Sequence, residues 1–329
     1  MDALNIINKI KDADLLGKGG AGFPVGLKWE MVAKAKADKK YIICNLSEGE
    51  PEVYKDGFIL KNYPEEIING IKIALKTIGK TTKQIQAYIY INPQYYQKYK
   101  NKLEKIITNL PIILFKKPKN YLAGEETTIL NVIEGKRAEP RIRPPFPTEV
   151  GLFGYPTLIN NAESFFWVSK IAQDKYRGNR FYSISQEGNP RGVYELPENW
   201  SIERILKKTG NFPDFDFFVQ AGGGASGEIL LPKELNQPLK GLGAMVIYNR
   251  KKTNPFSLME KWADFFLKAN CDKCVPCREG VFRLAKIIKS KELDRSLLED
   301  IFFVMEKTSF CPLGRTIPVP FKTLIDKLI

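Results

Sequence analysis

The sequence of 329 residues contains no histidine and only five cysteines. Without histidine the chain has no imidazole for acid–base catalysis, and a His-ligated metal site is excluded. No run approaches the roughly 18 consecutive apolar residues of a membrane-spanning helix. The first residues mix charges into their apolar positions, which is not typical of a signal peptide. These absences predict a soluble protein that stays in the cytoplasm.

Acidic side chains are almost absent from one part of the chain. Residues 71–120 contain eleven lysines against one acid, Glu104, and so carry +10 of the formal net charge of +14. Such a segment could contact nucleic acid, anionic lipid or an acidic partner protein. Because no recognition motif accompanies the charge, we expect a solvated lysine-rich surface and no nucleic-acid partner.

The length suggests two or three domains, and the 43% of hydrophobic residues is enough to build their cores. Apolar spacing predicts helices at 3–14, 62–80 and 94–109, and buried strands at 39–45 and 84–92. Strands and helices thus alternate through the first 110 residues. This order predicts an α/β layer with a largely parallel sheet.

The remainder of the chain contains three segments of different predicted structure. The proline-rich segment 136–161 is unsuited to a helix or a central strand and predicts an extended surface segment. Short alternating runs within 179–232 predict a small β-rich domain. From Ser257 onward apolar residues recur at helical spacing, so we expect a C-terminal helical bundle.

Four of the five cysteines lie in the last third, as Cys271, Cys274 and Cys277 in a C-x-x-C-x-x-C pattern and Cys311 before a proline. Three closely spaced thiolates and a distant Cys-Pro ligand are typical of a [4Fe–4S] cluster. Zinc sites more often use two separated C-x-x-C pairs, and disulfides are unusual in a large intracellular chain, so both remain weaker alternatives. Cys44 ends an apolar strand and is expected to be a small buried residue.

Five glycines crowd the segment 15–29, at positions 17, 19, 20, 22 and 26, and predict a loop. Glycine lets backbone amides approach a ligand closely, and Lys28 could neutralise a phosphate. The run follows a helix rather than a strand, so the usual Rossmann fingerprint is not met. Taken alone, a flexible turn explains it equally well.

Two polar groups accompany this loop. Asn45, Glu48 and Glu50 follow a predicted strand, and Gly124 to Glu126 open a predicted helix. Acids in the first turn of a helix interact favourably with its dipole. Carboxylates and amides around a glycine-rich turn can equally accept hydrogen bonds from ribose or ribityl hydroxyls.

The motifs together resemble one family. They are GKGGAGFPVGLKW (17–29), CNLSEGEP (44–51) followed by Lys55 and Asp56, YLAGEETTILNVIEGKRAEPRIRPPFP (121–147), GYPTLINNAES (154–164), CDKCVPCREG (271–280) and CPLG (311–314). In this order they are similar to the flavoprotein subunit (51 kDa type, FMN- and NADH-binding) of NADH:quinone oxidoreductase, respiratory complex I. Diaphorase subunits of NAD-linked hydrogenases and formate dehydrogenases belong to the same family.

This resemblance implies three domains: an FMN/NADH-binding α/β domain at 1–175, a soluble-ligand-binding β-grasp (ubiquitin-like) domain at 176–240, and a helical bundle with a [4Fe–4S] cluster at 241–329. The implied activity is that of an NADH dehydrogenase subunit. Hydride passes from NADH to FMN through cofactor stacking, without a catalytic side chain. Electrons then pass singly to the cluster, which requires the glycine turn and the four sulfurs to fold within electron-tunnelling distance.

The implied partners are a small thioredoxin-like [2Fe–2S] subunit and a larger iron–sulfur subunit. Contact with the inner membrane would be peripheral and only through the complex. Two departures from the family, Ser47 in place of an aspartate and Met31 in place of an aromatic residue, support an alternative. In that alternative the chain is a non-catalytic flavin/iron–sulfur relay or assembly subunit. A zinc-stabilised nucleic-acid binder is a third hypothesis.

The resemblance also assigns residues to each cofactor. The expected FMN contacts are Gly17, Gly19, Gly20, Lys28, Asn45, Glu48, Tyr121, Gly124, Glu125, Asn160 and Asn161. The expected NADH contacts are Phe23, Glu50, Glu126, Arg143 and Phe146, and Glu48 and Glu125 also face the nucleotide. The expected cluster ligands are Cys271, Cys274, Cys277 and Cys311.

Overall fold

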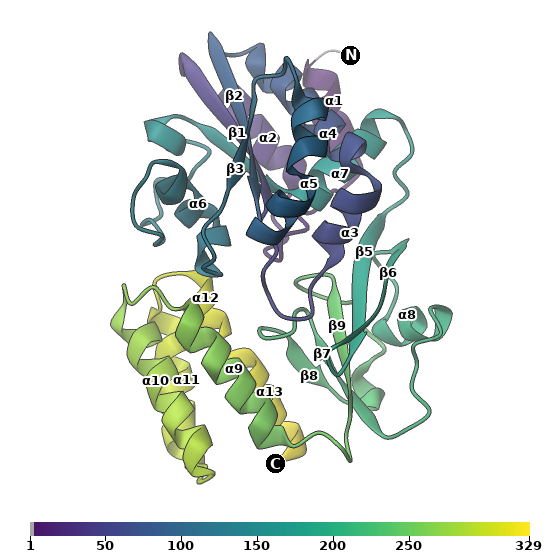
Figure 1. The fold of residues 1–329 in the computed structure, drawn as a ribbon, viewed down its shortest axis with the longest axis vertical. Helices are drawn as coiled ribbons and strands as arrows, with labels where there is room; N and C mark the ends of the chain where they lie inside the picture. Colours follow the sequence, from purple (N-terminus) through teal and green to yellow (C-terminus); the bar gives the residue numbers. More distant parts are fainter. Residues whose placement is uncertain (1–2) are drawn as a thin grey trace. The chain divides into compact units, whose positions relative to one another are not determined.

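The computed structural model describes residues 3–329, coloured along the chain in Figure 1. Residues 1–2 of the expected first domain lie outside the described residues. Internal contacts divide the chain into two compact units. The first unit contains residues 3–49, Tyr54–Lys119 and Ala123–Phe181, and the second contains Glu50–Val53, Asn120–Leu122 and Tyr182–Ile329. No helix among residues 3–329 is both long and apolar enough to cross a bilayer.

The first unit is built on a four-stranded sheet in the order β3-β2-β1-β4. Every neighbouring pair is parallel, which confirms the predicted α/β layer. The strands are β1 (Lys39–Leu46), β2 (Gln84–Ile91), β3 (Ile112–Lys116) and β4 (Thr157–Asn161). Parallel strands need crossover connections, and the helices that supply them cover both faces of the sheet.

Most of the helices pack on one face of this sheet. They are α2 (Val25–Lys34), α4 (Pro64–Gly79), α5 (Pro93–Ile107) and α7 (Ala162–Ala172), while α1 (Ala3–Asp12) packs on α2, α4 and α7. The short helix α6 (Glu126–Ile133) packs on the other face, where Ile129 and Leu130 share a core with Tyr41 and Ile43 of β1. Because side chains alternate along a strand, Ile42 and Cys44 point to the opposite face.

The predicted helices and strands of the first 110 residues are confirmed, apart from shifts at their ends. The structure adds α3 (Lys55–Asn62), a helix that the sequence does not predict. Its weak amphipathic pattern is the reason that the spacing of apolar residues does not reveal it.

The prediction of a loop throughout 15–29 is wrong for its last residues, because α2 begins at Val25. The loop closes earlier, where Gly17 N donates to Phe23 O at 3.0 Å and Val25 N donates to Leu15 O at 2.9 Å. Gly26 lies inside the helix, and a Cβ atom there would approach Lys11 Cγ to 2.6 Å. This glycine therefore permits close packing of α1 on α2 and does not mark a turn.

Up to Pro156 the proline-rich segment contains only one short 3₁₀ turn, η2 (Leu152–Gly154), but its last five residues form β4, a buried edge strand paired with β1. The prediction of a surface segment is wrong for these residues because the prolines end before the strand begins. Arg141 fixes the irregular part through bonds to Asn131 Oδ1 at 2.8 Å and Gly151 O at 3.1 Å and an ion pair with Glu134 at 2.8 Å.

The second unit contains a five-stranded sheet in the order β6-β5-β9-β7-β8. The strands are β5 (Asn179–Gln186), β6 (Asn189–Pro197), β7 (Phe217–Ala221), β8 (Glu228–Leu230) and β9 (Ala244–Asn249). β5 and β9 are parallel, whereas β7 is antiparallel to β8 and β9. The last strand lies beyond residue 240, the expected end of the β-rich domain. Helix α8 (Ile202–Lys208) packs on one face of the sheet through Ile202, Ile205 and Leu206.

Helices form the rest of the second unit, which confirms the predicted helical C-terminal region. They are α9 (Pro255–Ala269), α10 (Val275–Ser290), α11 (Arg295–Thr308), α12 (Pro312–Thr316) and α13 (Pro318–Leu328). Trp262, Phe266 and Phe321 share one core with Phe218 and Val246 of the sheet. The sheet and the helices therefore pack together within this unit.

Candidate cofactor sites

The carboxyl ends of β1 and β4 bring several predicted site residues together. These strands are parallel neighbours, and Asn45 of β1 lies opposite Asn161 of β4. Open parallel sheets bind their ligands at this edge. Trp29 Nε1 of α2 donates to Asn160 Oδ1 at 3.0 Å, so the helix that follows the glycine loop is tied to the same edge.

The glycine loop packs against the start of α7. A Cβ atom on Gly19 would lie 3.4 Å from Asn161 Cβ, and Lys18 N donates to Ser164 Oγ at 3.1 Å. Gly20 and Gly22 have positive φ values of 107° and 64°, which other residues rarely adopt. The loop is therefore a defined structure, anchored at several points.

Lys28, Glu126 and Arg143 form a cluster of charged side chains beside this loop. Lys28 Nζ lies 2.6 Å from Glu126 Oε1, and Arg143 Nη1 lies 3.3 Å from Glu126 Oε2. Lys28 Nζ also lies 5.6 Å from the centre of the Phe23 ring. Phe23 and Phe146 are 42% and 47% exposed, so both rings are accessible within the first unit. Residues expected at FMN and at NADH thus lie side by side.

Glu125 is the N-cap of α6. Its Oε2 accepts hydrogen bonds from Thr127 N at 3.0 Å and Thr128 N at 2.8 Å, and Arg143 Nη2 lies 3.5 Å from Oε1. Just before it, Gly124 O accepts from Asn45 Nδ2 at 3.0 Å. A Cβ atom on Gly124 would collide with the Ser47 side chain, so glycine is required for this close approach. One carboxylate oxygen of Glu125 is therefore committed to capping.

Glu48 performs a similar role for α3. Its two carboxylate oxygens accept from Asp56 N at 2.9 Å and Gly57 N at 3.0 Å, and Tyr95 Oη donates to Oε2 at 2.6 Å. Burial, followed by the negative charge of Asp56, raises the pKa of Glu48 to about 7, although Lys55 and these donors act in the opposite direction. Both oxygens are occupied by protein donors in this structure.

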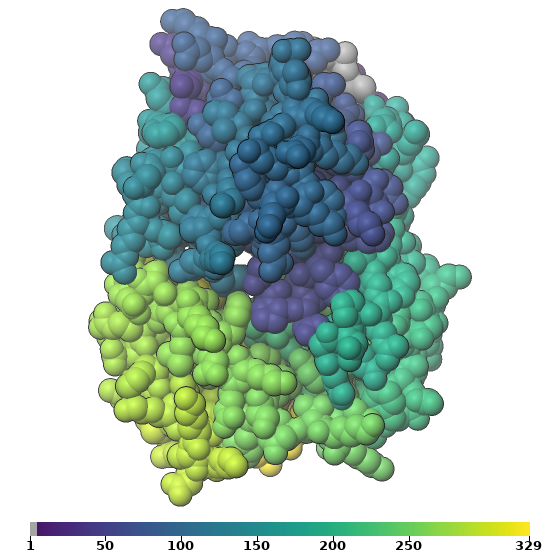
Figure 2. Space-filling view, in the orientation of Figure 1, coloured from purple at the N-terminus to yellow at the C-terminus, as the bar shows by residue number. Residues whose placement is uncertain are grey.

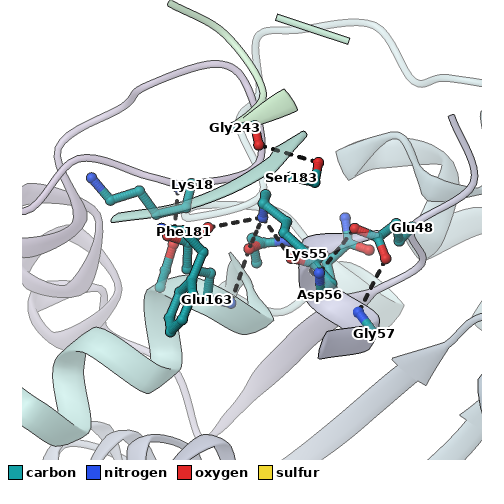
Figure 3. A network of polar contacts seen from close by, with 12 residues as sticks. Lys18, Glu48, Lys55, Asp56, Gly57, Glu163, Phe181, Ser183 and Gly243 are labelled. Atoms are coloured by element: carbon teal, nitrogen blue, oxygen red, sulfur yellow. Dashed lines mark hydrogen bonds and ion pairs between the residues drawn. The ribbon is translucent and has the colours of Figure 1, made fainter. Parts of the chain in front are cut away.

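A buried ion network lies beneath the glycine loop (Figure 3). Lys55 Nζ lies 2.5 Å from Asp56 Oδ1 and 2.9 Å from Glu163 Oε2. Burial lowers the pKa of Lys55, but the charges of Asp56 and Glu163 outweigh it and the pKa is raised. Burial likewise opposes the lowered pKa of Glu163, which Lys55 and Arg180 produce. Two cations and two carboxylates therefore face one another in this buried cluster.

Sequence reasoning assigned no role to this network. Lys55 and Asp56 entered only as part of a motif, and a lysine in so basic a chain is most simply a surface residue. The signal that could have found them is an adjacent Lys-Asp pair that both precedes the apolar residues of a helix and follows the acidic stretch 48–52.

Two further predicted residues, Glu50 and Tyr121, belong to the second unit. Glu50 is 5% exposed, and its Oε1 accepts from Ala225 N at 3.1 Å and Ser226 N at 2.8 Å. Tyr121 Oη donates to its Oε2 at 3.1 Å. A side chain on Gly223 would overlap the carboxylate, so the glycines of this loop make room for Glu50.

The four cysteines of the second unit gather around the start of α10. Cys274 is the N-cap of that helix, Cys277 lies in its first turn, and Cys311 is the N-cap of α12. Burial raises the pKa of Cys277 to about 12, and the nearby thiols of Cys274, Cys311 and Cys271 add to the shift. Gly314 makes this approach possible, since a Cβ atom there would lie 3.0 Å from Cys277 Cβ.

Four thiolates are the ligand set of a [4Fe–4S] cluster. Within residues 3–329, no three Cys, Asp or Glu side chains are arranged to hold one metal ion. A zinc ion would require its sulfurs to converge on one point, whereas each sulfur around a [4Fe–4S] cluster binds its own iron. Cys44 is fully buried in β1, as predicted for a structural residue.

The lysine-rich segment lies on the outside of the first unit, where α5 is blue in Figure 2. The exposed lysines are Lys72, Lys76, Lys80, Lys83, Lys98, Lys102, Lys105, Lys116 and Lys119. Lys117 is buried, and burial lowers its pKa to about 8. The surface is therefore lysine-rich and exposed, as expected.

Two family models match the chain. The Nuo51 FMN-binding domain matches residues 10–170, and the iron–sulfur binding region of NADH-ubiquinone oxidoreductase F matches residues 257–328. The first match covers the glycine loop and the sheet edge, and the second covers all four clustered cysteines.

Relatives that match 90% or more of this chain agree with the two family models. The F 2 component of the NADH-quinone oxidoreductase of Rhizobium meliloti is 31% identical over 94% of this chain and 83% of its own length. The F component of the same enzyme in Buchnera aphidicola subsp. Schizaphis graminum is 31% identical over 90% of this chain and 75% of its own length. The alpha subunit of the NAD-reducing hydrogenase HoxS of Cupriavidus necator is 30% identical over 98% of this chain and 59% of its own length.

Among solved structures, the air-oxidised state of an NAD⁺-reducing [NiFe]-hydrogenase superposes with a TM-score of 0.90 at 27% identity. It covers 99% of this chain, which spans 61% of the hydrogenase chain. The glycine loop at a parallel sheet edge, the gathered thiols and these similarities all point the same way: this chain belongs to the family of the flavoprotein component F of NADH-quinone oxidoreductase.

Proposed function

We propose that the chain is the NADH dehydrogenase (diaphorase) subunit of a larger redox complex. The observation that carries this proposal is the pairing of two sites: a glycine loop beside amides and carboxylates in the first unit, and four gathered thiols in the second. When bound, FMN would accept hydride from NADH, and the [4Fe–4S] cluster would pass the electrons on singly. The residues only bind and orient these groups, so a chain without histidine suffices.

The FMN site would be formed by the loop and the sheet edge. The amides of Gly17, Gly19 and Gly20 can approach a ligand closely, and Lys28 supplies a cation beside them. The Lys28 ammonium now pairs with Glu126, so a phosphate would compete with that carboxylate. Asn45, Asn160, Asn161, Gly124 and Glu125 complete the proposed set, with Glu48 and Tyr121 as further members.

The nucleotide site would use Phe23 and Phe146 as exposed rings for stacking, with Glu126 and Arg143 as polar contacts. Stacking on an aromatic ring contributes roughly 1–3 kcal/mol for a nucleobase. Glu50 now accepts hydrogen bonds on both carboxylate oxygens. A direct contact between Glu50 and NADH would therefore require one of these bonds to be exchanged.

The division at 1–175, 176–240 and 241–329 remains part of the proposal. The middle part is proposed to be a β-grasp domain, because its first and last strands are parallel neighbours and α8 covers one face. Including β9 would extend it to Asn249. The proposed partners are a thioredoxin-like [2Fe–2S] subunit and a larger iron–sulfur subunit.

The test is to reconstitute the purified chain anaerobically with FMN, iron and sulfide and then add NADH. We expect NADH to bleach the flavin absorbance and to support ferricyanide reduction. Bound flavin that NADH does not bleach would contradict the proposal and favour the relay alternative. Zinc without iron or labile sulfide would favour the third hypothesis instead.

A further inference from the structure

The first turn of α7 connects the buried ion network to the glycine loop. Asn161 is the N-cap of this helix, with its Oδ1 accepting from Glu163 N at 2.9 Å. Three residues later, Ser164 Oγ accepts from Lys18 N at 3.1 Å. One turn of helix therefore carries both a member of the network, Glu163, and the anchor of the loop.

The network fixes the Asn161 amide at both of its ends. Its Nδ2 donates to Asp56 Oδ2 at 2.6 Å and to Asn45 O at 3.4 Å. Its Oδ1 accepts from Lys55 Nζ at 3.4 Å as well as from Glu163 N. Because these groups occupy the amide, Asn161 packs against the loop through its Cβ, which faces Gly19, and a contact between its amide and FMN would require one of these bonds to be exchanged.

Most charges of this cluster are paired, and the buried carboxylate of Glu48 lies beside it, interacting with both Lys55 and Asp56. Lys55 and Asp56 are ion-paired and almost fully buried, and Glu163 pairs with Lys55 while lying near the buried Arg180. Removing one partner would leave an uncompensated buried charge, which destabilises a protein strongly. The network therefore holds the first turn of α7 in one position, and Ser164 in that turn holds the loop through its bond to Lys18 N.

We propose that Lys55 and Ser164 are positioning residues for the FMN site, acting through the first turn of α7 on the backbone of residues 17–22. This inference rests on the proposed function, since it assigns the loop to FMN. Neither residue is required to touch the cofactor. The loop's amides would be held ready for the ligand, which lowers the ordering cost of binding.

Ser164→Ala is the direct test, because it removes only the acceptor of the Lys18 N bond. We expect the FMN dissociation constant of the full chain to rise about fivefold, the factor typical of one hydrogen bond. Amide exchange at residues 19–22 should become faster in the flavin-free protein, while the midpoint of thermal unfolding stays close to the wild-type value. Ser169→Ala is the control for FMN affinity and loop exchange, since Ser169 is buried on the same helix but bonds Glu66, Asn69 at 2.8 Å and Gln173 at 3.1 Å. It is not a control for stability, because it loses three hydrogen bonds.

Lys55→Met alone is expected to unfold, so the pair is tested as Lys55→Met/Asp56→Leu. This double variant removes one charge of each sign, leaves Glu163 with Arg180, and takes from Glu48 one charged neighbour of each sign. We expect it to fold and yet to bind FMN about tenfold more weakly, because Asn161 loses two partners. Wild-type FMN affinity and loop exchange in both Ser164→Ala and the double variant would overturn the proposal. If the wild-type chain binds no FMN, the proposed function fails, and loop exchange alone decides whether these residues position the loop.

Discussion

At the scale of single residues, the surroundings of a carboxylate decide what it does. Glu48 and Glu163 are both withdrawn from water, yet the pKa of Glu48 is raised and that of Glu163 is lowered. Glu163 lies between two cations, Lys55 and Arg180, which outweigh the effect of burial. At Glu48 the negative charge of Asp56 adds to the effect of burial, and the opposing effect of Lys55 is smaller.

The raised pKa of Glu48 predicts a pH dependence of stability. The folded protein binds this proton more tightly than an unfolded chain with the ordinary value of 4.5. The free energy of unfolding should therefore fall as the pH rises from about 4.5 to about 7. Between pH 5 and pH 7.5 the free energy of unfolding of Glu48→Gln should therefore fall by about 1–3 kcal/mol less than that of the wild type. Chemical denaturation of the flavin-free proteins at the two pH values measures this difference.

The control for this measurement is Glu104→Gln, which removes an exposed carboxylate of α5. It should keep the wild-type dependence on pH. Equal slopes for Glu48→Gln and the wild type would show that the Glu48 proton is not coupled to folding.

At the scale of elements, close helix packing depends on glycines that the sequence pattern does not explain. Gly70 lies in the middle of α4, where glycine weakens a helix. The structure supplies the reason: a Cβ atom there would overlap the backbone oxygen of Phe165 in α7. The same reasoning accounts for Gly26, which the sequence placed in a loop. The strands β1 and β2 were predicted correctly because apolar runs such as YIIC are informative by themselves, whereas β3 was not predicted and β4 was assigned to a surface segment.

Gly70→Ala should therefore destabilise the first unit, despite the higher helix propensity of alanine. We expect a loss of about 1–3 kcal/mol in the free energy of unfolding, the usual effect of overpacking. Gly79→Ala in the same helix is the matched control, because its Cβ would make an ordinary 3.4 Å contact with Ile85. Urea denaturation should show Gly79→Ala at least as stable as the wild type. A Gly70→Ala variant of equal stability would mean that α4 and α7 adjust freely.

At the scale of the whole molecule, most of the residues proposed for FMN belong to one compact unit and the residues proposed for the cluster to the other, with Tyr121 as the exception. The four thiols lie in the second unit, and the glycine loop with its sheet edge lies in the first. Each unit has its own hydrophobic cores. Loss of one cofactor should therefore leave the binding residues of the other in place.

Cys277→Ser should reduce bound iron and labile sulfide, because it removes one of the four proposed cluster ligands. FMN affinity should stay within about twofold of the wild-type value, because Cys277 lies in the second unit and the glycine loop in the first. Iron analysis and flavin fluorescence titration measure the two effects separately. Cys44→Ala is the control, because Cys44 is buried in β1 and should leave the iron content unchanged. Retention of iron by Cys277→Ser would remove this residue from the ligand set.

The sequence by itself determined the kinds of element and the kinds of chemistry. Apolar periodicity is a local property, and it predicted the parallel α/β layer and the C-terminal helices. Cysteine spacing is also local, and it indicated an iron–sulfur cluster. The glycine run, likewise local, indicated a ligand-binding loop. Only the tertiary structure decided which partners each polar group has. Lys55 and Asp56 of α3 meet Glu163 of α7. Glu48 accepts from the first amides of α3, and Glu50 accepts from the amides of Ala225 and Ser226, which are distant in sequence. Burial and pairing depend on the whole fold, so no local pattern could assign these roles.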